Sequence, residues 1–353
     1  MSDFAAVILA AVDNDDLSSE YTKPLFNLLG KPTVGYVIDA CRNAGAREIV
    51  LVIGQDDKRS KSIFGTEIKY AVQRGGSGSG NACLQAKKFL GEIKTVIVVP
   101  GIAPAIQAST IQSLVDYHIK SGSDATILTA VPQQNGFEES LFLSDDTRYI
   151  EDSESHQKSS CESSVREYNT GIYCFNAETL FKRLKQLKAK SQSVSIHLSS
   201  VIELFSKYNN LIQTLRCQEP DDVRCACSLA DIACLSAVIK QRKLKELMHS
   251  GVSIIDPASV WIDTTVTIGP ETAIKPFTVI EGNTKLGAGC EIGPFAHISD
   301  SRLADGVKAS FCRISSRELP LNATVCTFEN LTGESLAHWF SSVHNRSKTD
   351  VHR

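Results

Sequence analysis

The sequence has no excess of charge of either sign. Its 353 residues contain 37 Lys and Arg against 40 Asp and Glu, which gives a net charge of −3. A protein that binds nucleic acid through phosphate contacts normally carries a clear positive excess. We therefore expect no nucleic-acid partner.

Long hydrophobic runs are also missing. No apolar run approaches the roughly 20 residues that a membrane-spanning helix needs. The apolar stretch near the N-terminus follows no Lys or Arg and is soon interrupted by acidic residues, so it differs from a secretory signal. We expect a cytoplasmic protein with no membrane partner.

The cysteines lack a paired framework. There are 11 of them, an odd number, scattered along the chain. This pattern favours reduced thiols in the cytoplasm over disulfides. Cys225 and Cys227, with Cys217 and Cys234 nearby, also raise the alternative of a metal site. Their spacing differs from a CxxC pair and no second pair follows, so we favour buried thiols.

Alternating strands and helices dominate the first two thirds of the chain. Ala5–Ala11 is a continuous apolar run, typical of a parallel strand that is covered on both faces. The order of the later segments predicts a doubly wound, Rossmann-like α/β domain. The further strands are predicted at Ile49–Ile53, Ile93–Val99, Ala125–Val131 and Ile172–Phe175, and helices at Val34–Ala44, Ala82–Leu90 and Thr110–Ser121. The acidic, Ser-rich segment Asp145–Arg166 is predicted to be an exposed excursion.

The pattern then changes twice. Leu229–His249 has helical spacing without Gly or Pro and predicts one long helical arm. After it, one aliphatic residue recurs at every sixth position, at Ile262, Ile268, Ile274, Ile280, Leu286, Ile292 and Ile298. This period predicts a left-handed parallel β-helix, in which each unit forms one face of a triangular coil. The register breaks after Ile298, so we expect a short solenoid of about three coils. The predicted domains are 1–228, an arm at 229–250, a β-helix at 251–315 and a polar tail at 316–353.

Several motifs resemble the sugar-1-phosphate nucleotidyltransferases, in particular the uridyltransferase half of the bacterial bifunctional N-acetylglucosamine-1-phosphate uridyltransferases. They are Lys23-Pro24-Leu25, the segment from Gln73 to Gly80, Tyr149-Ile150-Glu151 and Asn169-Thr170-Gly171. The resemblance implies that Gln73, Gly78 and Ser79 contact the uracil. It places Gly136, Glu151 and Asn169 at the sugar and Lys23 at a phosphate. Each residue alone could equally be an ordinary turn or surface residue.

The resemblance also implies a nucleotidyl-transfer reaction, but several residues that promote this reaction in the family are missing here. In the family a sugar phosphate attacks the α-phosphorus of UTP, helped by a Gly-rich loop with an Arg and by Mg²⁺ held by an Asp and an Asn. Ile102 and Arg224 occupy the two ligand positions, and neither can coordinate a hard cation. The loop positions carry Asp13, Asp15 and Asp16 instead of glycines and an arginine, which would repel a triphosphate. We predict impaired or lost catalysis, although the three acids could bind a cation themselves rather than form a solvated turn.

We predict no acetyl transfer, which is the second activity of the bifunctional members of the family. The acetyl-CoA site of the family lies on coils beyond the point where this solenoid is predicted to stop, and His297 is expected at the surface. The family's β-helices pack as trimers, so a homotrimer is expected. Three interpretations follow: a divergent uridylyltransferase, a UDP-sugar-binding regulator without catalysis, and a trimeric β-helix scaffold.

Overall fold

The computed structural model describes residues 3–11, 23–55, 57–74, 76–131, 167–190, 195–326 and 330–331. The chain divides into two compact units. Unit 1 contains Met1–Leu28 and Pro32–Leu235, and unit 2 contains Leu29–Lys31 and Ser236–Arg353. Each unit has its own hydrophobic core, so each is described by itself.

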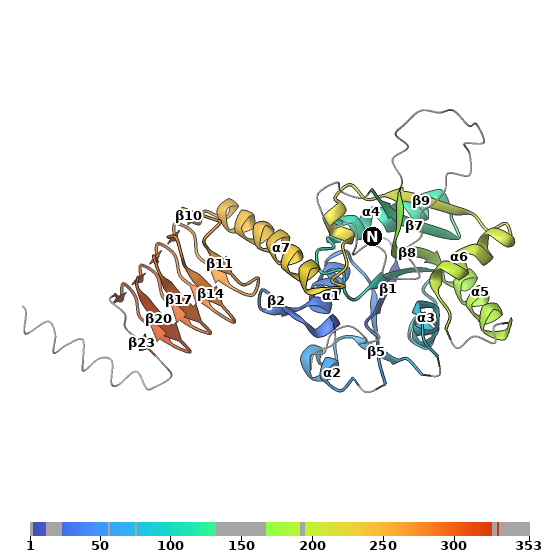
Figure 1. The fold of residues 1–353 in the computed structure, drawn as a ribbon, viewed down its shortest axis with the longest axis horizontal. Coiled ribbons are helices and arrows are strands. Elements are labelled where there is room, and N and C mark those ends of the chain that lie inside the picture. Colours follow the sequence, from blue (N-terminus) through green and yellow to red (C-terminus); the bar gives the residue numbers. More distant parts are fainter. Residues whose placement is uncertain are drawn as a thin grey trace, which may run out of the picture. The chain divides into compact units, whose positions relative to one another are not determined.

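Unit 1 is built on a seven-stranded sheet with the order β5-β4-β1-β6-β8-β7-β9 (Figure 1). The first four strands of this order run parallel, whereas β8 is antiparallel to both of its neighbours. This is the predicted doubly wound α/β architecture. The strands are β1 (Phe4–Leu9), β4 (Glu48–Ile53), β5 (Lys69–Val72), β6 (Thr95–Pro100), β7 (Ala125–Ala130), β8 (Tyr168–Asn176) and β9 (Ile212–Arg216).

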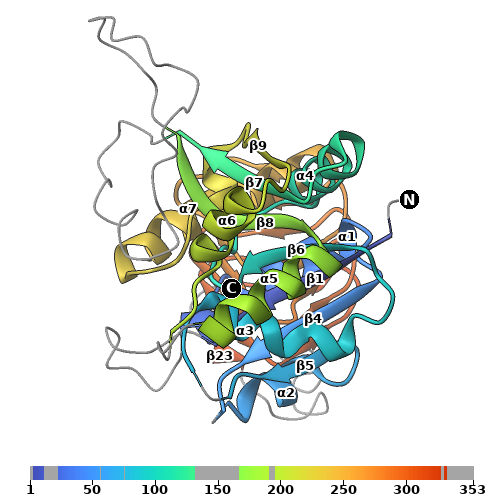
Figure 2. The ribbon, with the colours of Figure 1, turned by 90° about the vertical axis from the view of Figure 1, so that its right-hand side faces the viewer.

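Helices cover both faces of this sheet. Alternate side chains of β1 point into two separate cores, with Ala6 and Ile8 in one and Ala5 and Val7 in the other. Because both faces are covered, the strand is apolar throughout. Figure 2 shows α3, α5 and α6 in front of the sheet, and residues of α1 and α4 fill the core of the opposite face. The helices are α1 (Thr33–Asn43), α2 (Arg59–Phe64), α3 (Ser79–Ala86), α4 (Ala108–Ser121), α5 (Ala177–Lys190) and α6 (Leu198–Lys207).

Unit 2 is a left-handed parallel β-helix. The β-helix follows α7 (Leu229–His249), which has the predicted bounds and belongs to unit 2 from Ser236 onward. Three parallel sheets of five, five and four strands form its faces, and Ile262, Ile280, Ile298 and Ile314 stack in register along one of them. The first face consists of β10 (Ser253–Ile254), β13 (Ala273–Ile274), β16 (Glu291–Ile292), β19 (Lys308–Ala309) and β22 (Thr324–Val325). The second consists of β11 (Trp261–Ile262), β14 (Val279–Glu281), β17 (Ala296–Ser299), β20 (Cys312–Ser315) and β23 (Asn330–Leu331). The third consists of β12 (Thr267–Ile268), β15 (Lys285–Leu286), β18 (Arg302–Leu303) and β21 (Glu318–Leu319). A two-stranded sheet, β2 (Asn27–Leu28) and β3 (Lys31–Pro32), flanks the turn Leu29–Lys31.

The prediction that the β-helix stops at residue 315 is wrong. The three faces continue through β21, β22 and β23, as far as Leu331. Ile298 lies 18 residues after its partner Ile280, but Ile314 lies only 16 residues after Ile298. The missing residues come from the corners, while every face keeps its inward aliphatic side chain. A strict six-residue period in the sequence therefore fails to identify the later coils, although the β-helix continues through them.

A buried histidine in the core of unit 1 has a shifted pKa. His118 of α4 is 4% exposed, and its Nδ1 lies 2.9 Å from the Thr126 hydroxyl on β7. Burial lowers the pKa of His118 to about 4, although the nearby Asp124 carboxylate opposes the shift. The ring therefore stays neutral in the folded protein at pH values where it is protonated in the unfolded chain.

We expect acid to destabilise unit 1 through His118. Its contribution is complete above pH 6.5 and is lost as the pH falls toward 4, because the unfolded state then binds the extra proton. The free energy of unfolding should drop by about 2 kcal/mol between pH 7.5 and pH 5. Denaturant titrations of His118→Gln provide the control, because the carboxylates contribute equally to both proteins. Equal losses in the variant and the parent would contradict the assignment.

Candidate functional site

The candidate site lies at the carboxyl edge of the parallel strands. Ala10 follows β1, Gln73 follows β5, and Gly101 and Ile102 follow β6. In open α/β sheets ligands bind in the crevice outside these strand ends. Backbone bonds hold the ends together: the Gly101 N–H donates to Leu9 O at 2.8 Å. The first candidate residues therefore share one edge.

The glycine-rich segment after β5 is held by Gln73 and by a close backbone approach. The Nε2 of Gln73 donates to Gly76 O at 3.0 Å and to Gly78 O at 3.4 Å. Gly78 has φ 88° and ψ 157° and precedes α3. A Cβ at this position would lie 2.4 Å from Ile196 O. The loop therefore requires glycine at position 78, and the Gln73 amide braces the loop's carbonyls.

Ser79 connects this loop to a distant helix. Its hydroxyl accepts the Leu198 N–H at 2.9 Å, at the first residue of α6. The Gly80 N–H also donates to Ile196 O at 2.8 Å. Residues 78–80 are thus fixed against 196–198, which orders the N-terminus of α3 at the edge of the sheet.

Asn169 lies on β8 with its side chain buried. Its Nδ2 donates to the Tyr173 hydroxyl at 2.8 Å, and its Oδ1 accepts the Gly171 N–H at 3.0 Å. The pairing of β7 and β8 shifts register beside it, between Ile127 and Thr129. These contacts use one of the two amide N–H groups of Asn169 and its side-chain oxygen.

Lys23 begins the 3₁₀ turn Lys23–Leu25 and is 9% exposed. Its positive charge acts on the Cys227 thiol, where it opposes a rise in pKa that is caused by burial and by Asp231. Lys23 therefore lies near the segment that leads into α7. Sequence reasoning missed Cys227 as a neighbour of this lysine.

Ile102 meets the same segment through its backbone. The Ala226 N–H donates to Ile102 O at 2.7 Å. The resemblance aligned Arg224 with a metal ligand. In the structure Arg224 lies near Tyr168, whose pKa is raised to about 12, mainly by burial. The positive charge of Arg224 opposes this rise. The residues that adjoin Ile102 are thus those immediately before α7.

A capping box marks where α7 begins. The Ser228 hydroxyl accepts the Asp231 N–H at 3.2 Å, and the Asp231 Oδ2 accepts the Ser228 N–H at 2.9 Å. This Ser-x-x-acid pattern is visible in the sequence and agrees with the predicted start of the helix at Leu229.

The described residues do not fit a magnesium ion. No group of three or more His, Cys, Asp or Glu side chains among them could hold a metal. Ile102 offers no side-chain ligand, and burial raises the pKa of the Cys225 thiol far above neutrality. The Asp231 Oδ1 is the one buried carboxylate oxygen of this part of the chain without a hydrogen-bond partner. A hard cation needs about six oxygen ligands.

The remaining candidates cannot be placed. Gly136 and Glu151, as well as Asp13, Asp15 and Asp16, lie outside the described residues, as does the segment Asp145–Arg166, which was predicted to be an exposed excursion. Their roles remain predictions. The structure describes ten cysteines, and six of them are buried.

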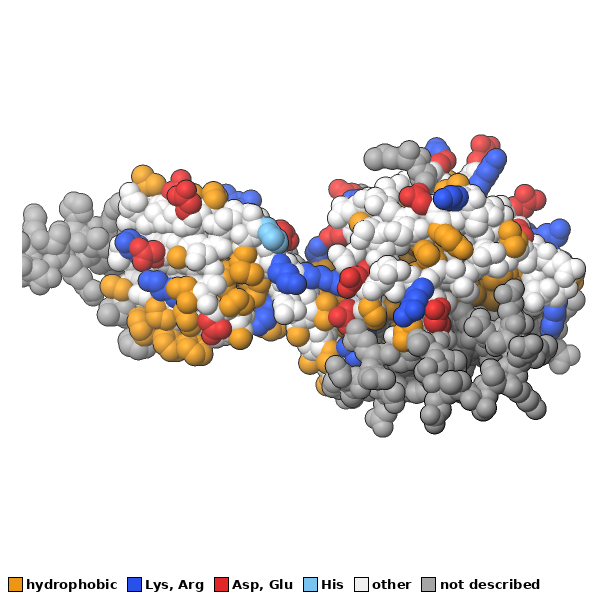
Figure 3. All heavy atoms as spheres, turned by 90° about the horizontal axis from the view of Figure 1, so that it is seen from above, with side chains coloured by type: hydrophobic (Ala, Val, Ile, Leu, Met, Phe, Trp, Pro, Cys, Tyr) orange, Lys and Arg blue, Asp and Glu red, His pale blue; other side chains and the backbone are white. Residues whose placement is uncertain are grey.

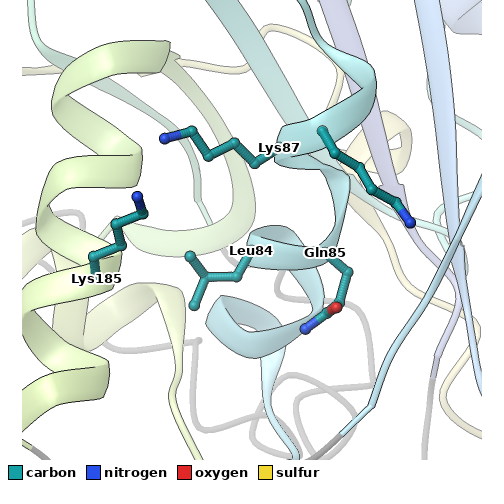
Figure 4. A pocket seen from close by; sticks show the side chains of 5 residues that line it. Leu84, Gln85, Lys87 and Lys185 are labelled. Carbon is teal, nitrogen blue, oxygen red and sulfur yellow. The ribbon is translucent and has the colours of Figure 1, made fainter.

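A separate basic hollow lies at the other end of α3. It has a volume of about 430 Å³ and is lined by Leu84, Gln85, Lys87, Lys88 and Lys185. Figure 4 shows Lys87 and Lys185 directed toward one another with Leu84 beneath them. Their repulsion lowers the pKa of Lys87. Because Gly78 and Ser79 are at the opposite end of α3, this hollow is not part of the site at the strand ends.

Comparison with known families decides the affiliation. Residues 15–264 match the nucleotidyl transferase family, and residues 265–300 match six bacterial transferase hexapeptide repeats. The chain belongs to the nucleotidyl transferase family. No helix of the described residues is long and apolar enough to cross a membrane.

Relatives with both parts are similar along most of this chain. The bifunctional protein GlmU of Syntrophomonas wolfei is 33% identical over 336 residues, which covers 94% of this chain and 74% of the relative. The bifunctional protein GlmU of Caldanaerobacter subterraneus is 30% identical, with coverage of 95% and 73%. The solved structure of CMP:2-keto-3-deoxy-manno-octonic acid synthetase in complex with CTP has a TM-score of 0.52 at 17% identity, covering 68% of this chain and 100% of that chain. That likeness supports the fold alone.

Proposed function

We propose that this nucleotidyl transferase binds a nucleotide sugar, nearest to UDP-N-acetylglucosamine, and that its uridylyl transfer is impaired or lost. The similarity to the GlmU proteins and the arrangement of Gln73, Gly78 and Asn169 support the binding part. The single observation that carries the loss is Ile102 at the end of β6, where the chain offers an aliphatic side chain instead of a metal-binding carboxylate.

The reaction explains why this position matters. A phosphate oxygen of N-acetylglucosamine-1-phosphate would attack the α-phosphorus of UTP, forming one P–O bond as the bond to pyrophosphate breaks. The protein contributes by positioning the groups and neutralising charge. Of the described side chains at the site, Lys23 and Arg224 are cationic, and Arg224 acts on Tyr168. The side chain of Ile102 offers no oxygen ligand to a metal ion that would neutralise the leaving pyrophosphate.

The decisive experiment measures pyrophosphate release from UTP and N-acetylglucosamine-1-phosphate with Mg²⁺. We expect turnover at least about 100-fold below the ordinary range of ~1–10³ per second. A turnover within that range would overturn the proposed loss of catalysis. Calorimetric titration with UDP-N-acetylglucosamine tests binding separately. If no heat appears up to millimolar ligand, the binding proposal fails and the scaffold function is the better explanation.

Ile102→Asp is the matched variant for this assay. The new carboxylate supplies one of the ligands that the family uses, but the Cys225–Cys227 segment still supplies none. We therefore expect no gain in turnover. A large Mg²⁺-dependent gain would show that Ile102 alone blocks the reaction.

The remaining parts of the proposal concern assembly, location and the second activity. We propose a homotrimer formed through the β-helix, in keeping with the match to hexapeptide repeats. The free cysteines of the described residues agree with a cytoplasmic location. We propose no acetyl transfer. His297 lies in the β-helix, is half-exposed, and its Nε2 lies 2.8 Å from Glu281 Oε2.

A further inference from the structure

The basic hollow lies between two elements of unit 1 that pack in the same core. One is α3 with the 3₁₀ turn η2 (Lys87–Phe89) that follows it, and the other is α5. Figure 2 shows α3 and α5 side by side in front of the sheet. Three of the five residues that line the hollow are lysines, and no Asp or Glu of the described residues is among them. The hollow is therefore positively charged.

This local charge differs from that of the chain as a whole. The sequence has slightly more acidic than basic residues. On the face of the molecule drawn in Figure 3, acidic and basic side chains are interspersed. Lys87 and Lys88 are favourable near the C-terminal end of α3, because that end of a helix attracts cations. Lys185 lies in the middle of α5, so the helix end does not explain the third lysine.

Lys87 and Lys185 point toward one another across the hollow (Figure 4). Repulsion by Lys185 is the largest cause that lowers the pKa of Lys87, so the two ammonium groups lie close together. Two exposed lysines could avoid this repulsion by turning into solvent. The Nζ of Lys87 instead lies 5.7 Å from the centroid of the Phe181 ring, one turn before Lys185 on α5. An anion between the two ammonium groups would replace their repulsion by attraction to a shared ligand.

The charge and the size of the hollow indicate the class of ligand. A carboxylate carries a single negative charge and would neutralise only one of the two ammonium groups. A diphosphate carries several charges, and lysine binds phosphoryl groups as a point charge with three N–H donors. The volume of about 430 Å³ is in the range of small-molecule sites, and Leu84 provides an apolar floor. Nucleic acid would need a longer row of phosphate contacts.

We propose that the basic hollow binds a small molecule with a diphosphate or triphosphate group, whose oxygens accept hydrogen bonds from Lys87 and Lys185. This site is separate from the candidate site at the strand ends, because Gly78 and Ser79 lie at the opposite end of α3. Binding in the hollow therefore does not depend on the proposed function, and either can fail alone.

Calorimetric titration of the full chain with inorganic pyrophosphate tests this proposal. Lys87→Gln and Lys185→Gln each remove one charge from the hollow. We expect each to raise the dissociation constant at least about fivefold, because each removes a charge-assisted hydrogen bond. Lys182→Gln is the matched control, since it removes the same charge from an exposed position of α5 outside the hollow. The control should change the dissociation constant less than about twofold, and circular dichroism checks the fold of each variant.

Saturable binding that weakens in both hollow variants and persists in Lys182→Gln would support the proposal. An absence of heat up to millimolar pyrophosphate would overturn it. Equal weakening in all three variants would also overturn it, because the attraction would then depend on net charge alone. Binding that is lost only in Lys23→Gln would belong to the strand ends, which again contradicts the proposal.

ADP is the second probe and distinguishes two sources of the diphosphate. A higher affinity for ADP than for pyrophosphate indicates a nucleotide whose base lies on Leu84, whereas an equal or lower affinity indicates an inorganic diphosphate. Titration with UDP-N-acetylglucosamine measures the proposed function separately. Lys87→Gln should leave the dissociation constant of that ligand unchanged.

Discussion

Replacing Gly78 by Ala is expected to destabilise unit 1 by about 3 kcal/mol or more and to weaken nucleotide-sugar binding more than about tenfold. Two effects add. The combination of φ 88° and ψ 157° belongs to a region that is accessible in practice only to glycine. The new Cβ would also lie 2.4 Å from Ile196 O, and a backbone atom cannot rotate away. To relieve this clash, residues 78–80 would have to move away from residues 196–198, which would break the hydrogen bonds that order the loop.

Gly45→Ala is the matched control for this substitution. Gly45 has φ 87°, nearly the same as Gly78, but a Cβ there would meet nothing within 4 Å. Gly45→Ala should lower the free energy of unfolding by only about 1 kcal/mol, which is the cost of placing Ala in the left-handed region. Denaturant titration and calorimetry with UDP-N-acetylglucosamine measure both proteins. If Gly78→Ala loses no more stability than Gly45→Ala, the close approach to Ile196 does not constrain the loop.

Only part of the geometry of the candidate site can be predicted from the sequence. The spacing of glycines after β5 indicates a loop that approaches another backbone, because glycine is the residue that permits it. The identity of that backbone was hidden, since Ser79 and Leu198 are 119 positions apart. That Arg224 occupies the position of a metal ligand stays a prediction of the resemblance. The Ala226–Ile102 bond shows that later residues adjoin β6.

The fold was predicted best where burial is most complete. The central strand β1 has a continuous apolar run because helices cover both of its faces. The edge strands β5 and β9 were not predicted, because each pairs with one neighbour and keeps partly exposed side chains. The antiparallel direction of β8 has no signature in its apolar pattern. Helices α5 and α6 were also missed, although the alternation of elements left room for them.

The β-helix was recognised from the inward side chains alone, and these also determine its stability. Ile298→Ala is expected to lower the free energy of unfolding of unit 2 by about 3–4 kcal/mol. Ile298 is fully buried, and it lies in register between Ile280 and Ile314. The cavity would weaken contacts with both neighbouring coils. In a solenoid each coil is stabilised mainly by its neighbours, so damage in a central coil affects both halves.

Hydrogen exchange can localise this effect. Amides of β14, β17 and β20 should lose protection in Ile298→Ala, whereas amides of the central sheet of unit 1 should keep theirs, because unit 1 has separate cores. Ile255→Ala is the control, since Ile255 is 62% exposed and should change stability by no more than about 0.5 kcal/mol. If Ile298→Ala exposed unit 1 amides to the same degree, the two units would unfold together. In that case the inward aliphatic residues of the coils would stabilise unit 1 as well as the β-helix.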